Sequence, residues 1–139
     1  MNTKGEEAKK CFECGYNCSQ AVFCTFCKEL GIDKETALKI ASSFGGGMGR
    51  MREVCGAVTG MFMAAGLKYG YTLPENPSEK TEHYKKIQIL AERFKERNGS
   101  IICRELLEKA KVTHSNKKSC GELVKDAAEI FDEFIKENG

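Results

Sequence analysis

Along most of the chain, apolar residues recur every three or four positions, which is the spacing of an amphipathic helix rather than of a strand. The two prolines, Pro74 and Pro77, lie close together, so they interrupt this helical pattern in a single place. We find no repeat at a fixed period and no internal linker. The pattern predicts an all-α protein, with residues 1–139 forming one domain, a helical bundle of about five to seven helices.

A glycine-rich segment, Gly45–Gly49, separates two of these predicted helices. The helix before it begins after Asp33, a residue type that commonly caps helix N-termini. From about Met51 to Leu67 the residues are mostly apolar or small, which predicts a buried central helix with Cys55 one turn inside it. The glycine-rich segment should therefore be the loop that leads into the centre of the bundle.

The C-terminal half predicts one long charged helix and two shorter amphipathic ones. The long helix should run from about Ser78 to Arg97 and end at the Asn98–Gly99 pair, which is typical of a helix C-cap. Ser100 and Ser119 each precede an amphipathic run and are the expected N-caps of the last two helices. A polar loop at residues 113–118 should connect them.

The charges of the chain are almost balanced, with 22 Lys+Arg against 20 Asp+Glu and a net charge of +2. We find no concentrated basic face, so neither nucleic acid nor a membrane surface is an expected partner. The longest apolar stretch, Met61–Leu67, is far too short to span a bilayer, and the N-terminus lacks the basic-then-apolar pattern of a signal peptide. We therefore expect a cytoplasmic protein.

Eight cysteines are the most distinctive feature of the composition. In a reducing cytoplasm such a number points to metal binding or redox chemistry more than to structural disulfides. Two of the cysteines should begin helices: Cys18 follows Asn17 in a capping box, and Cys120 follows Ser119 in another. Thiolates are stabilised at helix N-termini, where the pKa of a cysteine falls below its ordinary value of about 8.5.

Two further cysteines have related settings. If Ser100 caps its helix, Cys103 occupies the third helical position, still within the first turn. Cys55 is followed by Gly56 and Gly60, whose spacing leaves one helix face without side chains. Another helix or a cofactor could approach that face closely, so the two glycines are candidate cofactor-binding residues.

The remaining four cysteines give weaker signals. Cys24 and Cys27 form a helical C-x2-C that faces away from Cys18, and we expect them to serve in packing. Cys11 and Cys14 form, with Cys18, a C-x2-C-x3-C spacing that is compatible with cluster ligation. The glycine after Cys14 should, however, turn the chain between the second and third of these thiols.

Other chemistry has less support. His83 and His114 neighbour no cysteine in sequence and are expected to be solvated, which disfavours a papain-like enzyme. The glycine segment lacks the Lys-Ser/Thr of a phosphate-binding loop. The methionines near the central helix would suit an adaptable interface, although a core role is commoner; they are Met48, Met51, Met61 and Met63.

The order of these motifs resembles a known family. Residues 15–22 read GYNCSQAV, residues 44–49 read FGGGMG and residues 55–60 read CGAVTG, with single cysteines downstream. This resembles the C_GCAxxG_C_C family of small bacterial and archaeal proteins. The resemblance implies a defining quartet, Cys18, Cys55, Cys103 and Cys120, and a redox role inferred from these cysteines, with an iron–sulfur cluster as one form of it and no established reaction.

Two hypotheses follow for the quartet. It ligates an iron–sulfur cluster, or its members undergo reversible dithiol/disulfide exchange, in electron transfer or redox sensing. Either would make the protein a thiol or iron–sulfur oxidoreductase component, working with a redox partner protein. A zinc site is less expected, because paired C-x2–4-C knuckles are absent from the quartet. The alternative is a helical adaptor, homodimeric or bound to a larger protein, with a structural zinc or incidental buried thiols.

Overall fold

The computed structural model describes residues 3–112 and 119–139. Within these ranges the regular structure is helical, apart from one isolated antiparallel bridge between Val54 and Ile102, so the all-α prediction is confirmed. The elements are, in chain order, α1 (Thr3–Glu13), α2 (Cys18–Thr25), α3 (Cys27–Leu30), α4 (Lys34–Ala41), the 3-10 turn η1 (Ser42–Phe44), α5 (Gly45–Met48), α6 (Gly56–Tyr69), α7 (Pro77–Asn98), α8 (Cys103–Val112) and α9 (Cys120–Asn138). The polar loop predicted at 113–118, with His114, lies outside the described residues.

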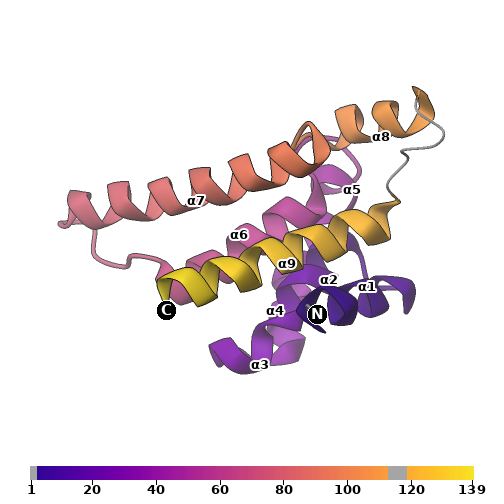
Figure 1. The fold of residues 1–139 in the computed structure, drawn as a ribbon. Coiled ribbons are helices and arrows are strands. Elements are labelled where there is room, and N and C mark those ends of the chain that lie inside the picture. Colours follow the sequence, from indigo (N-terminus) through magenta and orange to yellow (C-terminus); the bar gives the residue numbers. More distant parts are fainter. Residues whose placement is uncertain (1–2, 113–118) are drawn as a thin grey trace.

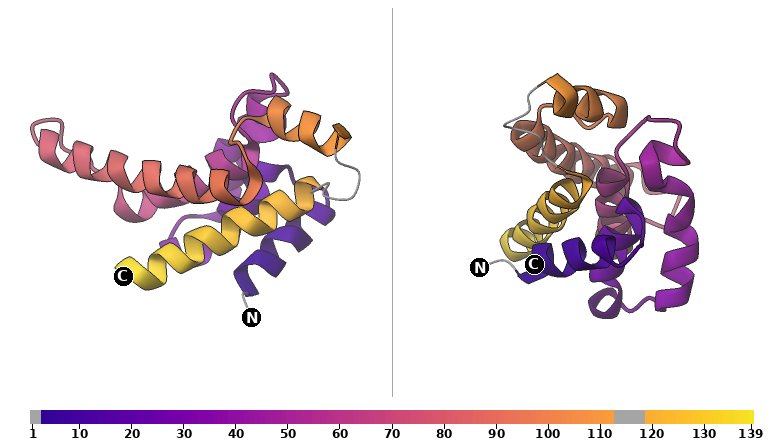
Figure 2. Two further views of the ribbon diagram at one scale, coloured as in Figure 1. Left: turned by 45° about the horizontal axis from the view of Figure 1, so that its top comes forward. Right: turned by 90° about the vertical axis from the view of Figure 1, so that its right-hand side faces the viewer.

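α6 and α9 form the centre of the bundle. α6 contacts α2, α7 and α9, and α9 also contacts α1 and α2. In each of these views α7 runs along one side of α9 and α1 along the other (Figures 1 and 2). The predicted central helix is thus buried between the N-terminal helices and the two long C-terminal ones.

Aromatic and small side chains fill the space between these helices. Phe26 and Phe131 are fully buried and meet edge to face, with ring centroids 4.9 Å apart. Val58 and Met61 of α6 are fully buried in the same core. Burying one such side chain stabilises the fold by about 1.5–3 kcal/mol, so this core supplies the main favourable term.

α7 was predicted as a long charged helix, and it extends from Pro77 to Asn98 with Gly99 in the left-handed conformation of a C-cap. Leu90 and Phe94 are buried, whereas Tyr84, predicted on the same apolar stripe, is 50% exposed. The reason is visible in Figure 1, where the N-terminal half of α7 extends past the end of α9.

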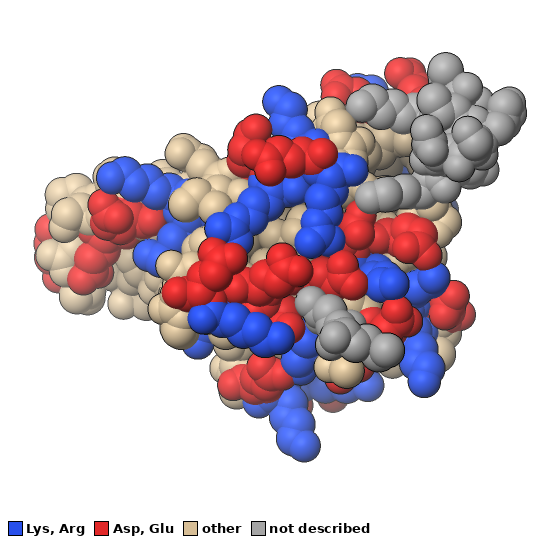
Figure 3. All heavy atoms as spheres, in the orientation of Figure 1, with Lys and Arg blue, Asp and Glu red and all other residues tan. Residues whose placement is uncertain are grey.

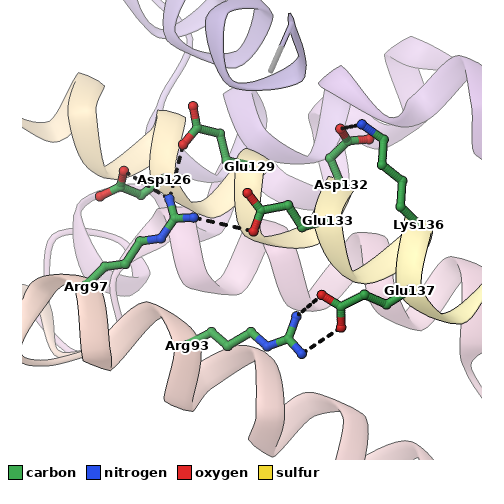
Figure 4. A network of polar contacts seen from close by, with 8 residues as sticks. All are labelled: Arg93, Arg97, Asp126, Glu129, Asp132, Glu133, Lys136 and Glu137. Carbon is green, nitrogen blue, oxygen red and sulfur yellow. Dashed lines mark hydrogen bonds and ion pairs between the residues drawn. The ribbon is translucent and has the colours of Figure 1, made fainter. Parts of the chain in front are cut away.

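Ion pairs join the charged face of α7 to α9. Arg93 donates two hydrogen bonds to the Glu137 carboxylate, at 3.1 and 2.8 Å. Arg97 lies among three acidic side chains of α9, and Figure 4 shows it between them: Asp126, Glu129 and Glu133. On the face drawn in Figure 3, side chains of both signs are interspersed over these helices, in keeping with the balanced composition.

Candidate thiol site at four helix N-termini

The N-terminal ends of four helices meet at one small cavity. Each end carries one cysteine of the predicted quartet, and all four line the cavity: Cys18 of α2, Cys55 at the start of α6, Cys103 of α8 and Cys120 of α9. The rest of its wall is formed by Arg52, three glycines and three leucines: Gly46, Gly47, Gly56, Leu106, Leu107 and Leu123. Residues that are up to 102 positions apart in sequence are therefore neighbours in space, and they share the partial positive charge of helix N-termini.

Two of these cysteines lie where the sequence predicted them, in the first helical position. The Asn17 side chain accepts from the Gln20 N–H at 2.9 Å, and the Gln20 side chain accepts from the Asn17 N–H at 3.0 Å, so α2 begins with a complete capping box. The Ser119 hydroxyl accepts from the Glu122 N–H at 3.3 Å and begins α9. These short-range hydrogen bonds fix the residue at which each helix starts.

The predicted position of Cys55, one turn inside the central helix, is wrong. Cys55 is the N-cap of α6, in a non-helical backbone conformation with φ −53° and ψ 134°. Its N–H donates at 2.8 Å to the carbonyl of Ile101, so a non-local backbone contact holds the chain extended up to this residue. The helix consequently begins at Gly56.

The predicted position of Cys103 is also wrong, by two residues. α8 begins at Cys103, and the Ser100 hydroxyl accepts from the Ile102 N–H at 3.0 Å rather than capping a longer helix. The Cys103 N–H donates at 2.6 Å to the carbonyl of Glu53. All four cysteines therefore stand at the N-cap or the first helical position, a closer equivalence than the sequence had indicated.

The glycine-rich segment shapes one wall of the cavity. Gly46 and Gly47 have positive φ angles of 68° and 72°, so the segment is a tight turn rather than a regular helix. This agrees with the loop that the sequence predicted here. A Cβ atom at Gly47 would lie 2.6 Å from the Cβ of Cys103 and 2.9 Å from the Cα of Arg52. Only glycine allows the loop to pass this close to the start of α8.

Backbone strain accumulates immediately after this turn. Among the described residues, three other than glycine have positive φ angles, namely Met48 (68°), Arg50 (66°) and Arg52 (62°). This conformation costs roughly 1–2 kcal/mol for each residue with a Cβ. Strain of this kind is found preferentially at functional sites, and here it brings Arg52 into the cavity wall.

The glycines of α6 let α2 approach its backbone. A Cβ at Gly56 would lie 3.0 Å from the Cβ of Cys18, and a Cβ at Gly60 would lie 2.6 Å from the carbonyl oxygen of Ser19. Gly56 lines the cavity, whereas Gly60 packs against α2 one turn farther along. Close helix packing is the observed use of this face, and the cofactor-binding role of the two glycines stays a prediction.

The electrostatics of the cavity separate the thiols. Cys18 and Cys120 pair through a thiol hydrogen-bonding interaction, which lowers the pKa of Cys120 to about 6, with help from the charge of Arg52 against the opposing effect of burial. The pKa of Cys18 is raised, because the interaction with Cys120 and burial both favour the protonated form of its thiol. The interaction therefore favours the thiolate form of Cys120 and the protonated form of Cys18.

The other two thiols are held differently. Burial raises the pKa of Cys55 to about 11, partly offset by the N–H groups of Ala57 and Val58 at the start of α6. The Sγ of Cys103 accepts a hydrogen bond of 3.9 Å from the Arg52 guanidinium. Arg52 thus lies beside Cys103 and also acts on Cys120, which makes it the main cation of the cavity. Sequence reasoning did not single it out, because its spacing matches no motif.

The cysteines outside the quartet form a second group. Cys24 lies near the end of α2 and Cys27 begins α3, because the predicted continuous helix breaks at Phe26. Burial raises the pKa of Cys24 to about 12 and raises that of Cys27, and the two thiols also interact with each other. Burial raises the pKa of Cys11 as well. Cys24 and Cys27 pack on the hydrophobic core, in agreement with the packing role expected for this C-x2-C pair.

His83 is less solvated than the sequence suggested. Its Nδ1 is buried, has no hydrogen-bond partner among the described residues, and its pKa is lowered by burial and by Lys86. It lines an open depression with Tyr69 and Tyr71, at the end of α7 that extends past the bundle. None of the quartet cysteines lines this depression.

The cavity can be compared with the groups that four thiolates commonly bind. Its volume of about 30 Å³ is close to the share of one water molecule in the liquid. Within residues 3–112 and 119–139, no three His, Cys, Asp or Glu side chains lie in an arrangement that could hold a metal ion. Four thiols are the donor set of an iron–sulfur cluster, but as they stand the described thiols do not form such a metal-holding group.

Comparison with known protein families gives one match. The family model described as "Putative redox-active protein (C_GCAxxG_C_C)" matches residues 16–134. The chain belongs to this family. The C_GCAxxG_C_C match includes all four cysteines of the cavity, together with Cys24 and Cys27, and leaves out Cys11 and Cys14. Neither a curated protein nor a solved structure matches the chain. Among the described residues, no helix is long and apolar enough to cross a bilayer.

Proposed function

We propose that this protein carries out reversible dithiol/disulfide exchange, with Cys18 and Cys120 as the redox pair. The observation that carries the proposal is that both thiols line one cavity at the first position of their helices, where their interaction lowers the pKa of Cys120. A dithiol of this kind combines a ready thiolate with a second thiol able to close the disulfide. Cys120, the first residue of α9, supplies the thiolate, and Cys18, the first residue of α2, supplies the second thiol.

The chemistry is a two-electron couple. When the pair is oxidised, the S–S bond between Cys18 and Cys120 forms, two electrons pass to a disulfide of the partner molecule, and the partner leaves as two thiols. The reverse reaction reduces the Cys18–Cys120 disulfide and oxidises two partner thiols. In the reduced state Cys120 holds the negative charge, stabilised by Arg52 and by the start of α9.

The remaining members of the quartet support this pair in different ways. Cys103 accepts from Arg52 and so helps to position the cation beside Cys120. Cys55 is 5% exposed and packs in the core, so it is the member least able to meet an external reactant. We propose Cys103 as the thiol most able to exchange with the pair, because it lines the same cavity and, unlike Cys55, is only half-buried.

The experiment is to oxidise the purified protein with oxidised glutathione and to map its disulfides by peptide mass spectrometry. We expect a loss of two hydrogen masses and one crosslink that joins the peptides of Cys18 and Cys120. Cys24→Ser is the matched control, since its thiol belongs to the other group and its substitution should leave the crosslink unchanged. A protein that retains both free thiols, or that links Cys24 to Cys27 first, would contradict the proposal.

Iron–sulfur cluster ligation is the second candidate, favoured by the convergence of four thiols at one cavity. It is tested by anaerobic reconstitution followed by assays for iron, acid-labile sulfide and zinc in wild type and in Cys55→Ala. Cluster binding requires stoichiometric iron and sulfide that Cys55→Ala reduces; exchange by Cys18 and Cys120 alone requires neither. A redox partner protein and a homodimer stay predictions, which size-exclusion mass and crosslinking would test.

A further inference from the structure

A second feature adjoins the thiol pair from the outside. Cys18 lines the small inner cavity and also an open groove of about 420 Å³. Cys120 lines the inner cavity but not this groove. The groove lies between α1, the start of α2 and the glycine-rich segment, and its other lining residues include Phe12, Asn17, Ser42 and Arg50. Cys18 is therefore the sulfur of the pair that a molecule in the groove would meet first.

The wall of the groove is suited to a small polar molecule. Three of its lining residues, Gly45, Gly46 and Gly49, have no side chain, so peptide groups form much of the surface. A Cβ at Gly45 would lie 2.6 Å from the side chain of Asn17, so the absence of side chains also permits the close packing that forms the groove. Its volume falls within the range of about 300–1,000 Å³ usual for small-molecule sites.

Arg50 supplies the charge of the groove. Its side chain is exposed, and no described residue forms an ion pair with it, whereas Arg104 is paired with Glu53 at 3.4 Å. No Asp or Glu lines the groove. Arg50 also remains in the left-handed conformation, with φ 66°, which holds it at this rim despite the strain. An unpaired guanidinium beside a thiol-bearing groove selects for a carboxylate.

We infer that the groove binds a low-molecular-weight thiol that carries a carboxylate, that Arg50 recognises the carboxylate, and that the mixed disulfide of the exchange forms on Cys18. This inference rests on the proposed function of the Cys18–Cys120 pair and names its substrate class. It assigns Arg50 a binding role that the family motif does not include.

The reaction is balanced as follows. The thiolate of the bound molecule attacks the Sγ of Cys18 in the oxidised protein, a new S–S bond forms, and the bond to Cys120 breaks with its electron pair left on Cys120. A second thiolate then attacks the sulfur of the bound molecule, which releases a small-molecule disulfide, and Cys18 leaves as a thiolate that takes a proton from water. Disulfide cleavage is fastest when the departing sulfur is the better thiolate, and Cys120 has that property.

The test uses full-length protein that has first been oxidised and shown to contain the Cys18–Cys120 disulfide. Its reduction is timed with 3-mercaptopropionate, which is anionic, and with cysteamine, which is cationic, at equal thiolate concentrations and low salt. We expect 3-mercaptopropionate to react about tenfold faster, an advantage that falls as salt is added. Acid-quenched samples should contain the added thiol on the Cys18 peptide.

Two variants separate recognition from general charge. Arg50→Gln should lower the rate with 3-mercaptopropionate by roughly three- to tenfold and leave cysteamine unaffected, while Arg50→Glu should reverse the preference. Lys39→Gln removes an exposed cation of α4 that is outside the groove and should change neither rate.

The inference is overturned if the mixed disulfide maps to Cys120, or if Arg50→Gln leaves the ratio of the two rates unchanged. Failure of the proposed function would give a different result. The Cys18–Cys120 disulfide would then not form in the oxidation step, and no oxidised protein would be available for the comparison of rates.

Discussion

Cys55 and Cys103 begin two helices from the two sides of the same backbone bridge. The N–H of Cys55 donates to Ile101 at 2.8 Å, and the N–H of Cys103 donates to Glu53 at 2.6 Å. The bridge thereby aligns the starts of α6 and α8, although 48 residues separate the two cysteines in sequence. Two hydrogen bonds thus place these thiols at one cavity, and neither bond involves a side chain.

The glycine turn that packs against this bridge gives the first prediction. Gly47→Ala should destabilise the protein by about 2–4 kcal/mol, because the new Cβ would be strained at positive φ and would meet Cys103 and Arg52. Gly49→Ala is the matched control, since Gly49 also has a positive φ but its Cβ would meet only Ser43, at 3.6 Å. That variant should lose about 1–2 kcal/mol. Urea unfolding measures both, and equal losses would contradict the proposed close contact.

The pH dependence of alkylation tests the state of Cys120. Because thiolate is the reactive form, the rate at Cys120 should rise with pH and reach half its maximum near pH 6, well below the value of about 8.5 for an ordinary thiol. Arg52→Gln should move this midpoint upward. Cys18→Ala should move it upward more than Cys18→Ser does, since serine keeps a hydrogen-bond donor. Residue-resolved mass spectrometry after iodoacetamide gives the profile; a wild-type midpoint near 8.5 would show that the pairing is absent.

The two groups of thiols should differ in reactivity. At pH 7, Cys24 should react about a hundredfold more slowly than Cys120, given pKa values of about 12 and about 6 and the weaker intrinsic nucleophilicity of the more acidic thiol. A time course of alkylation with quantified peptides measures the ratio. In urea the difference should disappear, because it arises from burial and from the neighbouring groups in the fold. A difference that persists in urea would have another origin.

Packing between α2 and α6 supplies a fourth prediction. Gly60→Ala should destabilise the protein by about 1–3 kcal/mol, since the Cβ would lie 2.6 Å from the carbonyl oxygen of Ser19 and α2 would have to move. Gly66→Ala, on the same helix, meets nothing within 4 Å and should stabilise by about 0.5–1 kcal/mol through helix propensity. Thermal or urea unfolding distinguishes them. If Gly60→Ala also stabilised the protein, the close approach of α2 would be incorrect.

The capping residues show how much of the site the sequence could predict. Asn17 and Ser119 place Cys18 and Cys120 at the first position of their helices through hydrogen bonds to residues three positions away, so both positions were predictable from local sequence. The same reasoning failed for Cys55 and Cys103. Their helices begin where a bridge between distant segments ends, and no short-range pattern contains that contact.

The sequence by itself determined the helical fold and the starts of α2 and α9, because helix periodicity and capping depend on neighbours within about four residues. Tertiary structure alone decided that the four helix starts share one cavity, that Arg52 lies beside two of the thiols and that Cys18 also faces a groove. These relationships depend on which helices pack together, and on a strained glycine turn whose left-handed residues include Arg50 and Arg52. Thiol reactivity follows from that proximity, since burial, a neighbouring charge and an interacting thiol arise only in the folded chain.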